Sequence, residues 1–299
     1  MTPARRIEFA RACFLHACRL DVAVRKPGNV SVASAGHGMH ATLFVASAQA
    51  AAARLFDAGA RVGPRIEAAT AASLAAAGCN TNLGIVLLCA PIAAAAERVD
   101  ACASAQALRA AVVAVLDGLD RDDAQAAFRA IALANPGGLG DAPAQDVRGA
   151  ASVDLRAAMV LAAGRDRIAA QYANGYADLF GLALPALQAP GVSPMRVNAS
   201  LAADARTTER VQHAYLQLLG AFPDSHIVRK HGLAVAQTVM RSAQAWLARA
   251  APGRDPDFVA WDESLKAGGI NPGTSADLTV AALFLAGLLA PDGAAWHET

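Results

Sequence analysis

The stretch LGIVLLCAPIAAAA, residues 83–96, contains no charged side chain, and the stretch LTVAALFLAGLLAP, residues 278–291, contains none either. Each is shorter than the roughly 18 apolar residues that a membrane-spanning helix requires. Neither shows the polar–apolar alternation of a half-buried strand. We therefore expect both stretches to form helices buried at the centre of a soluble bundle, with no membrane contact.

The composition extends this expectation to the whole chain. The 299 residues are 55% hydrophobic and only 5% aromatic, and alanine, the strongest helix former, is abundant. The predicted helices span residues 7–25, 40–58, 64–77, 81–97, 104–117, 121–133, 152–162, 165–187, 200–220, 225–250, 256–267 and 276–289. Ser104, Asp120 and Ser275 are suitable N-caps. The sequence predicts one all-α domain over residues 1–299, a bundle of about a dozen helices.

Charge and cysteine usage narrow the class of protein. The net charge of +1 gives no basic footprint for a nucleic acid. Five cysteines occur without metal-ligand spacing, and the N-terminal residues lack the long apolar run of a signal peptide. We expect reduced thiols in a cytoplasmic protein. The cysteines are Cys13, Cys18, Cys79, Cys89 and Cys102.

Five connectors between the predicted helices are long or rich in polar residues and glycine. They are residues 25–40, 78–84, 135–149, 223–232 and 268–278. Long connectors in a compact helical protein are more often functional than accidental. These segments are therefore the first candidates for a ligand site.

Lysine is rare and clusters in these connectors. Only three of the 26 basic residues are lysines, namely Lys26, Lys230 and Lys266, and each lies within three residues of a glycine. A flexible ammonium group suits phosphate as a point charge, and glycine lets backbone N–H groups approach an anion. The pattern favours anion binding, and the alternative is that the lysines are ordinary surface residues.

Several polar motifs have both a structural and a functional interpretation. Asn80 and Thr81 open an apolar helix, so they are either caps or contacts to a sugar or phosphate. Asp224 is either an N-cap or a ligand contact. The acidic stretch DRDD, residues 120–123, fits a helix start better than a metal motif. NPGGLG, residues 135–140, is a weak phosphate-loop candidate because no strand precedes it.

Taken in order along the chain, these motifs resemble the triphosphoribosyl-dephospho-CoA synthase family. RKPGNVS (25–31) resembles the family's PKPGLVD, and AGHGMH (35–40) resembles GAHKDM. GCNTNLG (78–84) is similar to GxNTHKG, and DSHIVRKHG (224–232) to DTNxxxRGG. NPGTSADL (271–278) is similar to SPGGSADL and is the most specific of these matches.

The resemblance implies an all-helical transferase that uses ATP as substrate and Mg²⁺ as cofactor. In this family the 2′-hydroxyl of dephospho-CoA attacks C1′ of the ATP ribose, adenine leaves, and the triphosphate stays attached. Breaking an N-glycosidic bond builds oxocarbenium-like charge on the ribose, which a nearby carboxylate stabilises. A carboxylate is also a suitable acceptor for the proton of the attacking hydroxyl.

The resemblance also suggests roles for individual residues. Asp224 and Asp277 are the predicted catalytic carboxylates, with metal binding as the competing role for both. Asp21 lies near the place of a family acid, although the spacing differs. The predicted nucleotide- and phosphate-binding residues are Lys26, Gly28, Asn29, Ser31, His37, Asn80, Thr81, Lys230, His231, Gly273, Thr274 and Ser275.

Departures from the family pattern leave other functions open. Asn82 and Leu83 replace a basic pair, and Thr274 replaces a glycine. The pattern is similar to a branch tied to tetrahydromethanopterin-linked one-carbon metabolism, where the acceptor would belong to pterin or furan cofactor biosynthesis. The remaining alternatives are a helical hydrolase of nucleotides or ADP-ribosyl groups and a non-catalytic nucleotide-binding protein. The alanine-rich faces would permit a homodimer.

Overall fold

The computed structural model describes residues 1–99, 104–136, 144–188, 203–249 and 251–290. These residues form fourteen α-helices with short π and 3₁₀ segments, so the all-α prediction is confirmed. The helices are α1 (Pro3–Ala23), α2 (Ala41–Leu55), α3 (Val62–Ala77), α4 (Leu83–Ala96), α5 (Ala105–Asp117), α6 (Arg121–Ala134), α7 (Leu155–Ala162), α8 (Arg167–Asn174), α9 (Leu184–Leu187), α10 (Ala205–Ala221), α11 (Ser225–His231), α12 (Leu233–Leu247), α13 (Pro256–Ala267) and α14 (Gly273–Leu288). The π segment is η1 (Leu179–Ala183), and the 3₁₀ segment is η2 (Pro252–Arg254).

The two apolar stretches lie at the centre, as predicted. Every residue of α4 is buried, and so is every residue of α14 from Leu278 onward. The two helices pack against each other, and α14 also packs against α1 and α10. Within the described residues, no helix is both long and apolar enough to span a lipid bilayer.

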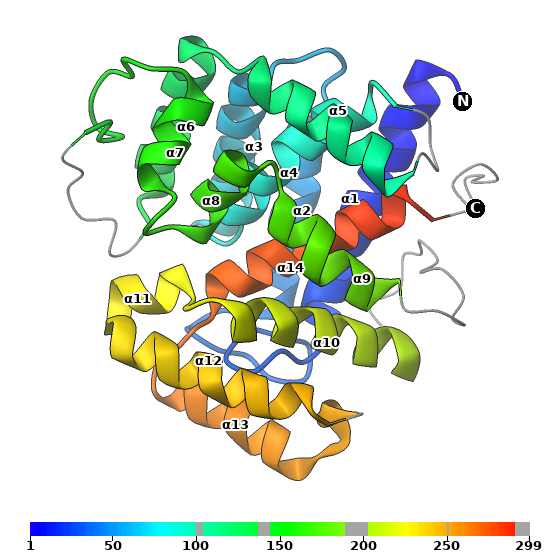
Figure 1. Cartoon of the computed structure of the whole chain (residues 1–299), viewed down its shortest axis with the longest axis vertical. Coiled ribbons are helices and arrows are strands. Elements are labelled where there is room, and N and C mark those ends of the chain that lie inside the picture. Colours follow the sequence, from blue (N-terminus) through cyan, green and yellow to red (C-terminus); the bar gives the residue numbers. More distant parts are fainter. Residues whose placement is uncertain (100–103, 137–143, 189–202, 250, 291–299) are drawn as a thin grey trace.

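The helices form two groups joined by α14. Helices α1 to α9 surround one large apolar cluster with α4 inside it, and α10 to α13 surround a second cluster. Figure 1 shows the first group above the second, with α14 crossing between them. Ala276, in the first turn of α14, belongs to the second cluster, whereas the rest of the helix belongs to the first. The start of α14 therefore lies where the two groups meet.

An internal proline in α4 is accommodated by a tyrosine. Pro91 has no N–H group, so it cannot donate to the carbonyl of Leu87 one turn earlier. The Tyr172 hydroxyl donates to that carbonyl at 2.6 Å, and the Tyr176 hydroxyl donates to the next carbonyl, that of Leu88, at 2.8 Å. Both tyrosines are fully buried. They fasten α8 and the following turn to α4.

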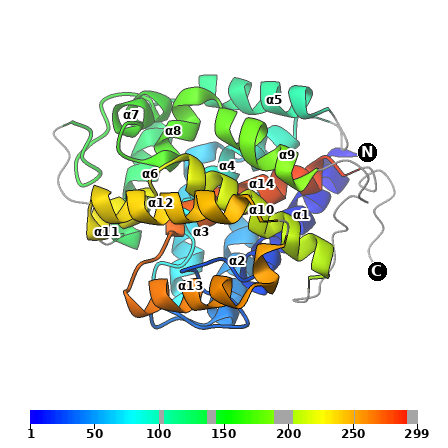
Figure 2. The same cartoon turned by 60° about the horizontal axis from the view of Figure 1, so that its bottom comes forward.

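Two of the predicted long helices are broken at glycine, and those predictions were wrong. The predicted helix 165–187 ends at Gly175, where φ is 63°, and the predicted helix 225–250 is divided at Gly232, where φ is 84°. Glycine adopts this left-handed region without a Cβ clash, so the chain can turn there. The break at Gly232 makes α11 a separate short helix, which Figures 1 and 2 show at one end of the molecule beside α12.

The helix caps follow the predictions at two places and depart from them at a third. Ser104 caps α5, and Asp120 caps α6 within a capping box, which gives the DRDD stretch its expected role at a helix start. Ser275, by contrast, is not an N-cap. Helix α14 starts earlier, with Pro272 at the cap position. The Ser275 hydroxyl donates to Asp224 and does not accept from an amide of its own helix.

Candidate active site

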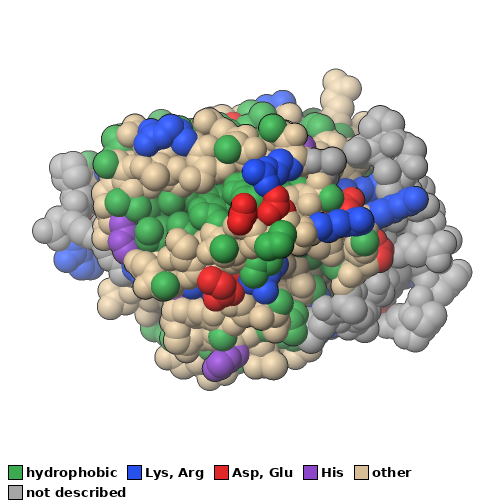
Figure 3. Space-filling view, turned by 90° about the horizontal axis from the view of Figure 1, so that it is seen from below, with side chains coloured by type: hydrophobic (Ala, Val, Ile, Leu, Met, Phe, Trp, Pro, Cys, Tyr) green, Lys and Arg blue, Asp and Glu red, His purple; other side chains and the backbone are tan. Residues whose placement is uncertain are grey.

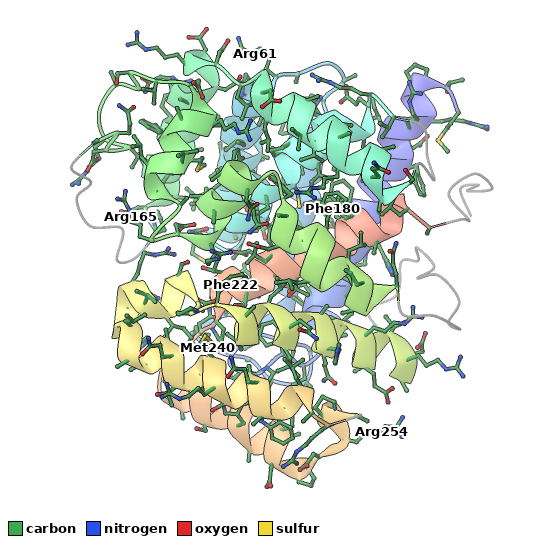
Figure 4. All side chains as sticks on the ribbon, viewed as in Figure 1. Arg61, Arg165, Phe180, Phe222, Met240 and Arg254 are labelled. Carbon is green, nitrogen blue, oxygen red and sulfur yellow. The ribbon has the colours of Figure 1, made fainter. Side chains whose placement is uncertain are left out.

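The five polar connectors meet around one cavity of about 490 Å³. Each connector contributes residues to its wall, and α1, α6, α7 and α8 complete it. Among the predicted site residues, the lining includes Asn29, His37, Asn80, Thr81, Lys230, Gly273, Thr274 and Asp277. In Figure 4 the labelled Arg165, another lining residue, lies at the left between the upper helices and α11.

One end of the cavity is basic. His226, Arg229 and Lys230 of α11 line it together with His37. Burial, together with the positive charges of the nearby Lys230 and Arg229, lowers the pKa of His226 from 6.5 to about 4. His226 is therefore neutral at pH 7, and its buried Nε2 atom has no hydrogen-bond partner in the described residues. A neutral imidazole surrounded by cations is a suitable contact for an anionic ligand.

Arg229 is held in this position by an aspartate. Its Nη1 atom lies 2.8 Å from Oδ2 of Asp166, and the other Asp166 oxygen caps α8 by accepting from the amide of Ile168 at 2.8 Å. The amide of Arg167 donates to the Ser225 hydroxyl at 2.9 Å. The start of α8 is therefore joined to α11 across the cavity mouth.

Asp277 provides a buried carboxylate beside this basic end. Burial raises its pKa well above the ordinary value, and the nearby carboxylates of Asp21 and Asp224 raise it further. Within the described residues the structure shows no hydrogen bond or ion pair to the Asp277 side chain. Gly84, in the first turn of α4, leaves room for it, because a Cβ atom at that position would overlap the carboxylate. The arrangement keeps a strongly basic carboxylate available inside the cavity.

Asp21 is the second cavity carboxylate, and Lys26 supports it from behind. Lys26 is fully buried and does not line the cavity. Its Nζ atom lies 2.9 Å from Oδ1 of Asp21 and also donates to the Asp21 backbone carbonyl. The structure therefore places Lys26 as the partner of a site carboxylate and not on the cavity surface.

Asp224 also lies behind the wall, with both carboxylate oxygens engaged. Oδ1 accepts from the amides of His226 at 2.9 Å and Ile227 at 3.1 Å. Oδ2 accepts from the Ser275 amide at 2.7 Å and from its hydroxyl at 2.8 Å. Burial raises the pKa of Asp224, and these hydrogen bonds oppose the rise. Asp224 thus joins the start of α11 to the start of α14, and Ser275 is part of this junction.

The segment 25–40 is fixed against α13 and the loop that follows it. The Gly28 amide donates to Asp262 at 2.8 Å, and a Cβ atom at Gly28 would lie 2.6 Å from a side-chain carbon of Pro272. Asn29 donates to the Asn271 side chain at 3.1 Å. Nε2 of His37 donates to the Gly28 carbonyl at 2.8 Å. Gly28 therefore permits a close backbone approach that places Asn29 and His37 in the cavity wall.

The other predicted residues have separate positions. Asn80 accepts from the Leu83 amide at 3.2 Å, and the Thr81 hydroxyl donates to Ser47 at 2.8 Å. Ser31 is buried away from the cavity, and His231 bonds the Gly269 carbonyl at 3.1 Å outside the lining. The site residues that sequence reasoning left out of the predicted set are Asp21, Asp166, His226, Arg229 and Asn271. Four of them lie within or beside the motifs that resemble the family, which is the signal that could have indicated them. Asp166 lies outside those motifs, and its local sequence indicates only a helix N-cap.

The cavity carboxylates also bear on whether the protein could hold a metal ion. No group of three or more His, Cys, Asp or Glu side chains in the described residues is arranged to hold a metal ion. Magnesium, however, is usually bound by one or two carboxylates together with water and substrate phosphate. The Asp277 carboxylate, whose pKa the nearby Asp21 carboxylate raises, fits that kind of substrate-bridged ion together with Asp21. They do not form a closed protein cage.

The fold and the cavity define an all-helical protein that combines a basic cavity wall with buried carboxylates. A match to the ATP:dephospho-CoA triphosphoribosyl transferase family covers residues 7–295, and the chain belongs to this family. Members transfer the triphosphoribosyl group from ATP to dephospho-CoA, and the chain is a transferase of this kind.

A solved structure shares the fold. It is the crystal structure of a proposed triphosphoribosyl-dephospho-CoA synthase from Archaeoglobus fulgidus, with a TM-score of 0.63 and 23% sequence identity. The alignment covers 81% of this chain and 97% of the other. A comparison with curated proteins gave no match.

Proposed function

We propose that this chain moves the triphosphoribosyl group of ATP to the 2′-hydroxyl of dephospho-CoA inside the 490 Å³ cavity. One observation carries the proposal. The basic side chains of α11 line the same cavity as the Asp277 carboxylate, which has no ion pair within the described residues. The former suit a triphosphate, and the latter suits the ribose carbon at which charge develops.

Asp277 is the group that we assign to the chemistry. Its raised pKa makes it a stronger base than an exposed carboxylate, so it accepts the proton of the attacking hydroxyl more readily. The O–C1′ bond forms, the bond from C1′ to adenine breaks, and the proton passes from Asp277 to the departing base. The reaction consumes no water. Asp224 holds α11 and α14 in register, and Asp21 and Lys26 set the field around Asp277.

The basic wall is assigned to the triphosphate. Arg229 and Lys230 supply positive charge, and the neutral His226 offers a ring nitrogen as a further contact. Gly273 and Thr274, at the start of α14, bring the backbone close to the same space. Asp21 and Asp277 are the residues that would hold Mg²⁺, and the ion would supply positive charge to neutralise the triphosphate.

A different acceptor in one-carbon cofactor biosynthesis is the second candidate. The observation that favours it is the loss of a basic pair at Asn82 and Leu83. Asn82 is buried, with Oδ1 accepting from the Ser73 hydroxyl, and Leu83 adds an apolar wall to the cavity. An acceptor with less negative charge than dephospho-CoA, such as a pterin or furan, would suit that wall.

The test is adenine release by the purified chain with ATP and Mg²⁺. We expect release that depends on dephospho-CoA, together with a product that carries the triphosphate. Asp277→Asn should abolish it, whereas Val160→Phe, on an exposed part of α7, should not. Adenine release without any acceptor would replace the transferase with a hydrolase. ATP binding without any turnover would support a non-catalytic protein.

Two further parts of the proposal concern the cell and the assembly. We propose a cytoplasmic location, because no disulfide joins the buried Cys13, Cys18 and Cys89 in the described part of the chain. Cys102 lies outside the described residues. A homodimer also stays a prediction. The face in Figure 3 mixes acidic, basic and apolar side chains without a broad patch of one charge.

A further inference from the structure

The cavity has two chemically unlike ends. The basic end is formed by α11, and the opposite end lies between α6, α7 and α8. Figure 1 shows α11 below α6, α7 and α8. Apolar side chains line the second end, among them Phe128, Ile131, Leu155, Ala158, Met159 and Ala162. We call this part the apolar end.

Asp277 lies at the border between the two ends. A Cβ atom at Gly84 would meet both the Asp277 carboxylate and Cδ1 of Ile168, which is 2.7 Å from that position. Ile168 is a lining residue of α8. The order along the cavity is therefore the cations of α11, then the Asp277 carboxylate, then apolar side chains.

The donor nucleotide has the same order of groups. In ATP the triphosphate is followed by the ribose and then by the base, and the bond that breaks joins C1′ to the base. If C1′ lies at Asp277 and the triphosphate lies at α11, the base must lie beyond Asp277. We propose that the apolar end is the subsite for the purine base of the donor nucleotide, which becomes the leaving group. This inference rests on the proposed function.

The apolar end recognises the faces of the base more than its edges. Both atoms of the Gln145 amide are bonded to Ser152, at 2.6 and 3.1 Å, and the Asp146 carboxylate is bonded to Arg148 at 2.8 Å. These polar lining groups are therefore already engaged. Buried apolar contact with a planar ring gives affinity without reading its exocyclic groups. The subsite should accept purines that differ at C6 and should bind the smaller pyrimidines less tightly.

Calorimetric binding of ligands to the full chain with Mg²⁺ tests the inference. We expect ATP to bind about tenfold or more tightly than ribose 5-triphosphate, because the base adds a stacking-sized contribution. ITP should bind within about tenfold of ATP, because an apolar pocket rejects such analogues poorly. Equal binding of ATP and ribose 5-triphosphate would overturn the subsite, and so would loss of ITP binding by more than about a hundredfold.

A pair of variants on α7 locates the base. Ala158 lines the cavity, whereas Val160, two residues later, is 51% exposed and does not. Ala158→Phe should weaken ATP binding at least about tenfold and leave inorganic triphosphate binding unchanged. Val160→Phe should change neither. If Ala158→Phe does not fold, the nucleotide series on the unaltered chain decides the matter.

The same variant distinguishes a subsite for the purine base from a subsite for the acceptor. If Ala158→Phe raises the KM for dephospho-CoA and leaves ATP binding intact, the apolar end is an acceptor subsite and the inference is wrong. If dephospho-CoA is never a substrate but ATP still binds through its base, the proposed acceptor is wrong and the base subsite stands.

Discussion

Replacing Asp224 by asparagine tests whether this residue joins two helices or acts on the substrate. The change keeps the oxygen that caps α11 but turns the other oxygen into an NH₂ group. That group would face the amide and the hydroxyl of Ser275, which now donate to Oδ2 at 2.7 and 2.8 Å. Two donors at a site that is 1% exposed would then have no acceptor.

The magnitude follows from those two hydrogen bonds. A buried donor without a partner costs about 1–3 kcal/mol, so we expect a loss of about 2–5 kcal/mol in the free energy of unfolding. This is a large part of the roughly 5–15 kcal/mol that stabilises a typical domain. Urea unfolding at pH 7 measures it, and the midpoint should fall with little change in the slope.

Asp204→Asn is the matched control. Asp204 also caps a helix, α10, by accepting from the Thr207 amide at 2.8 Å and from its hydroxyl at 3.0 Å, but it lies at an exposed position. Water can replace those bonds, so the loss should stay near 1 kcal/mol or below, as for other exposed caps (about 0.5–2 kcal/mol).

The two roles predict opposite results. If Asp224 only joins α11 to α14, the Asp224→Asn variant should be less stable, and its remaining activity should parallel the fraction of folded protein. If its stability equals that of the unaltered chain while adenine release falls more than about a thousandfold, the residue contacts substrate or metal. That result would refute the structural role.

Three further predictions concern the core and the cavity. Tyr172→Phe leaves the buried Leu87 carbonyl without a donor and should lower the free energy of unfolding in urea by about 1–3 kcal/mol. Tyr176→Phe should cost less, because the Leu88 carbonyl keeps its helical donor. Equal costs for the two variants would contradict this reasoning. Folding lowers the pKa of His226 from 6.5 to about 4, so the folded state favours the neutral imidazole. The resulting stability is fully present above about pH 6.5 and is lost as the pH falls toward 4. His226→Asn should therefore lose less stability than the unaltered chain between pH 7 and 4; parallel curves would argue against a buried neutral imidazole. Gly84→Ala should reduce kcat more than tenfold, because the added methyl group displaces the Asp277 carboxylate. The binding of inorganic triphosphate, measured by calorimetry, should stay unchanged. An unaltered kcat would show that the Asp277 carboxylate takes no part in the reaction.

The amino-acid sequence by itself determined the helical class and the elements that depend on near neighbours. Helix hydrogen bonds join residues four apart, so alanine content and apolar spacing were enough to predict the central helices 81–97 and 276–289. Local caps such as Ser104 and Asp120 were also evident, because a cap bonds amides two or three residues away. The ordered motifs likewise identified the connectors that line the cavity.

The tertiary structure alone decided which polar residues face that cavity. Asp224 and Asp277 both lie at or near a helix start, and their local sequences do not tell them apart. Packing places Asp224 between α11 and α14, where four donors surround it, and Asp277 against Gly84, where no donor from the described residues bonds its carboxylate. Contacts between segments some 50 to 250 residues apart depend on how whole helices pack, which no local pattern encodes.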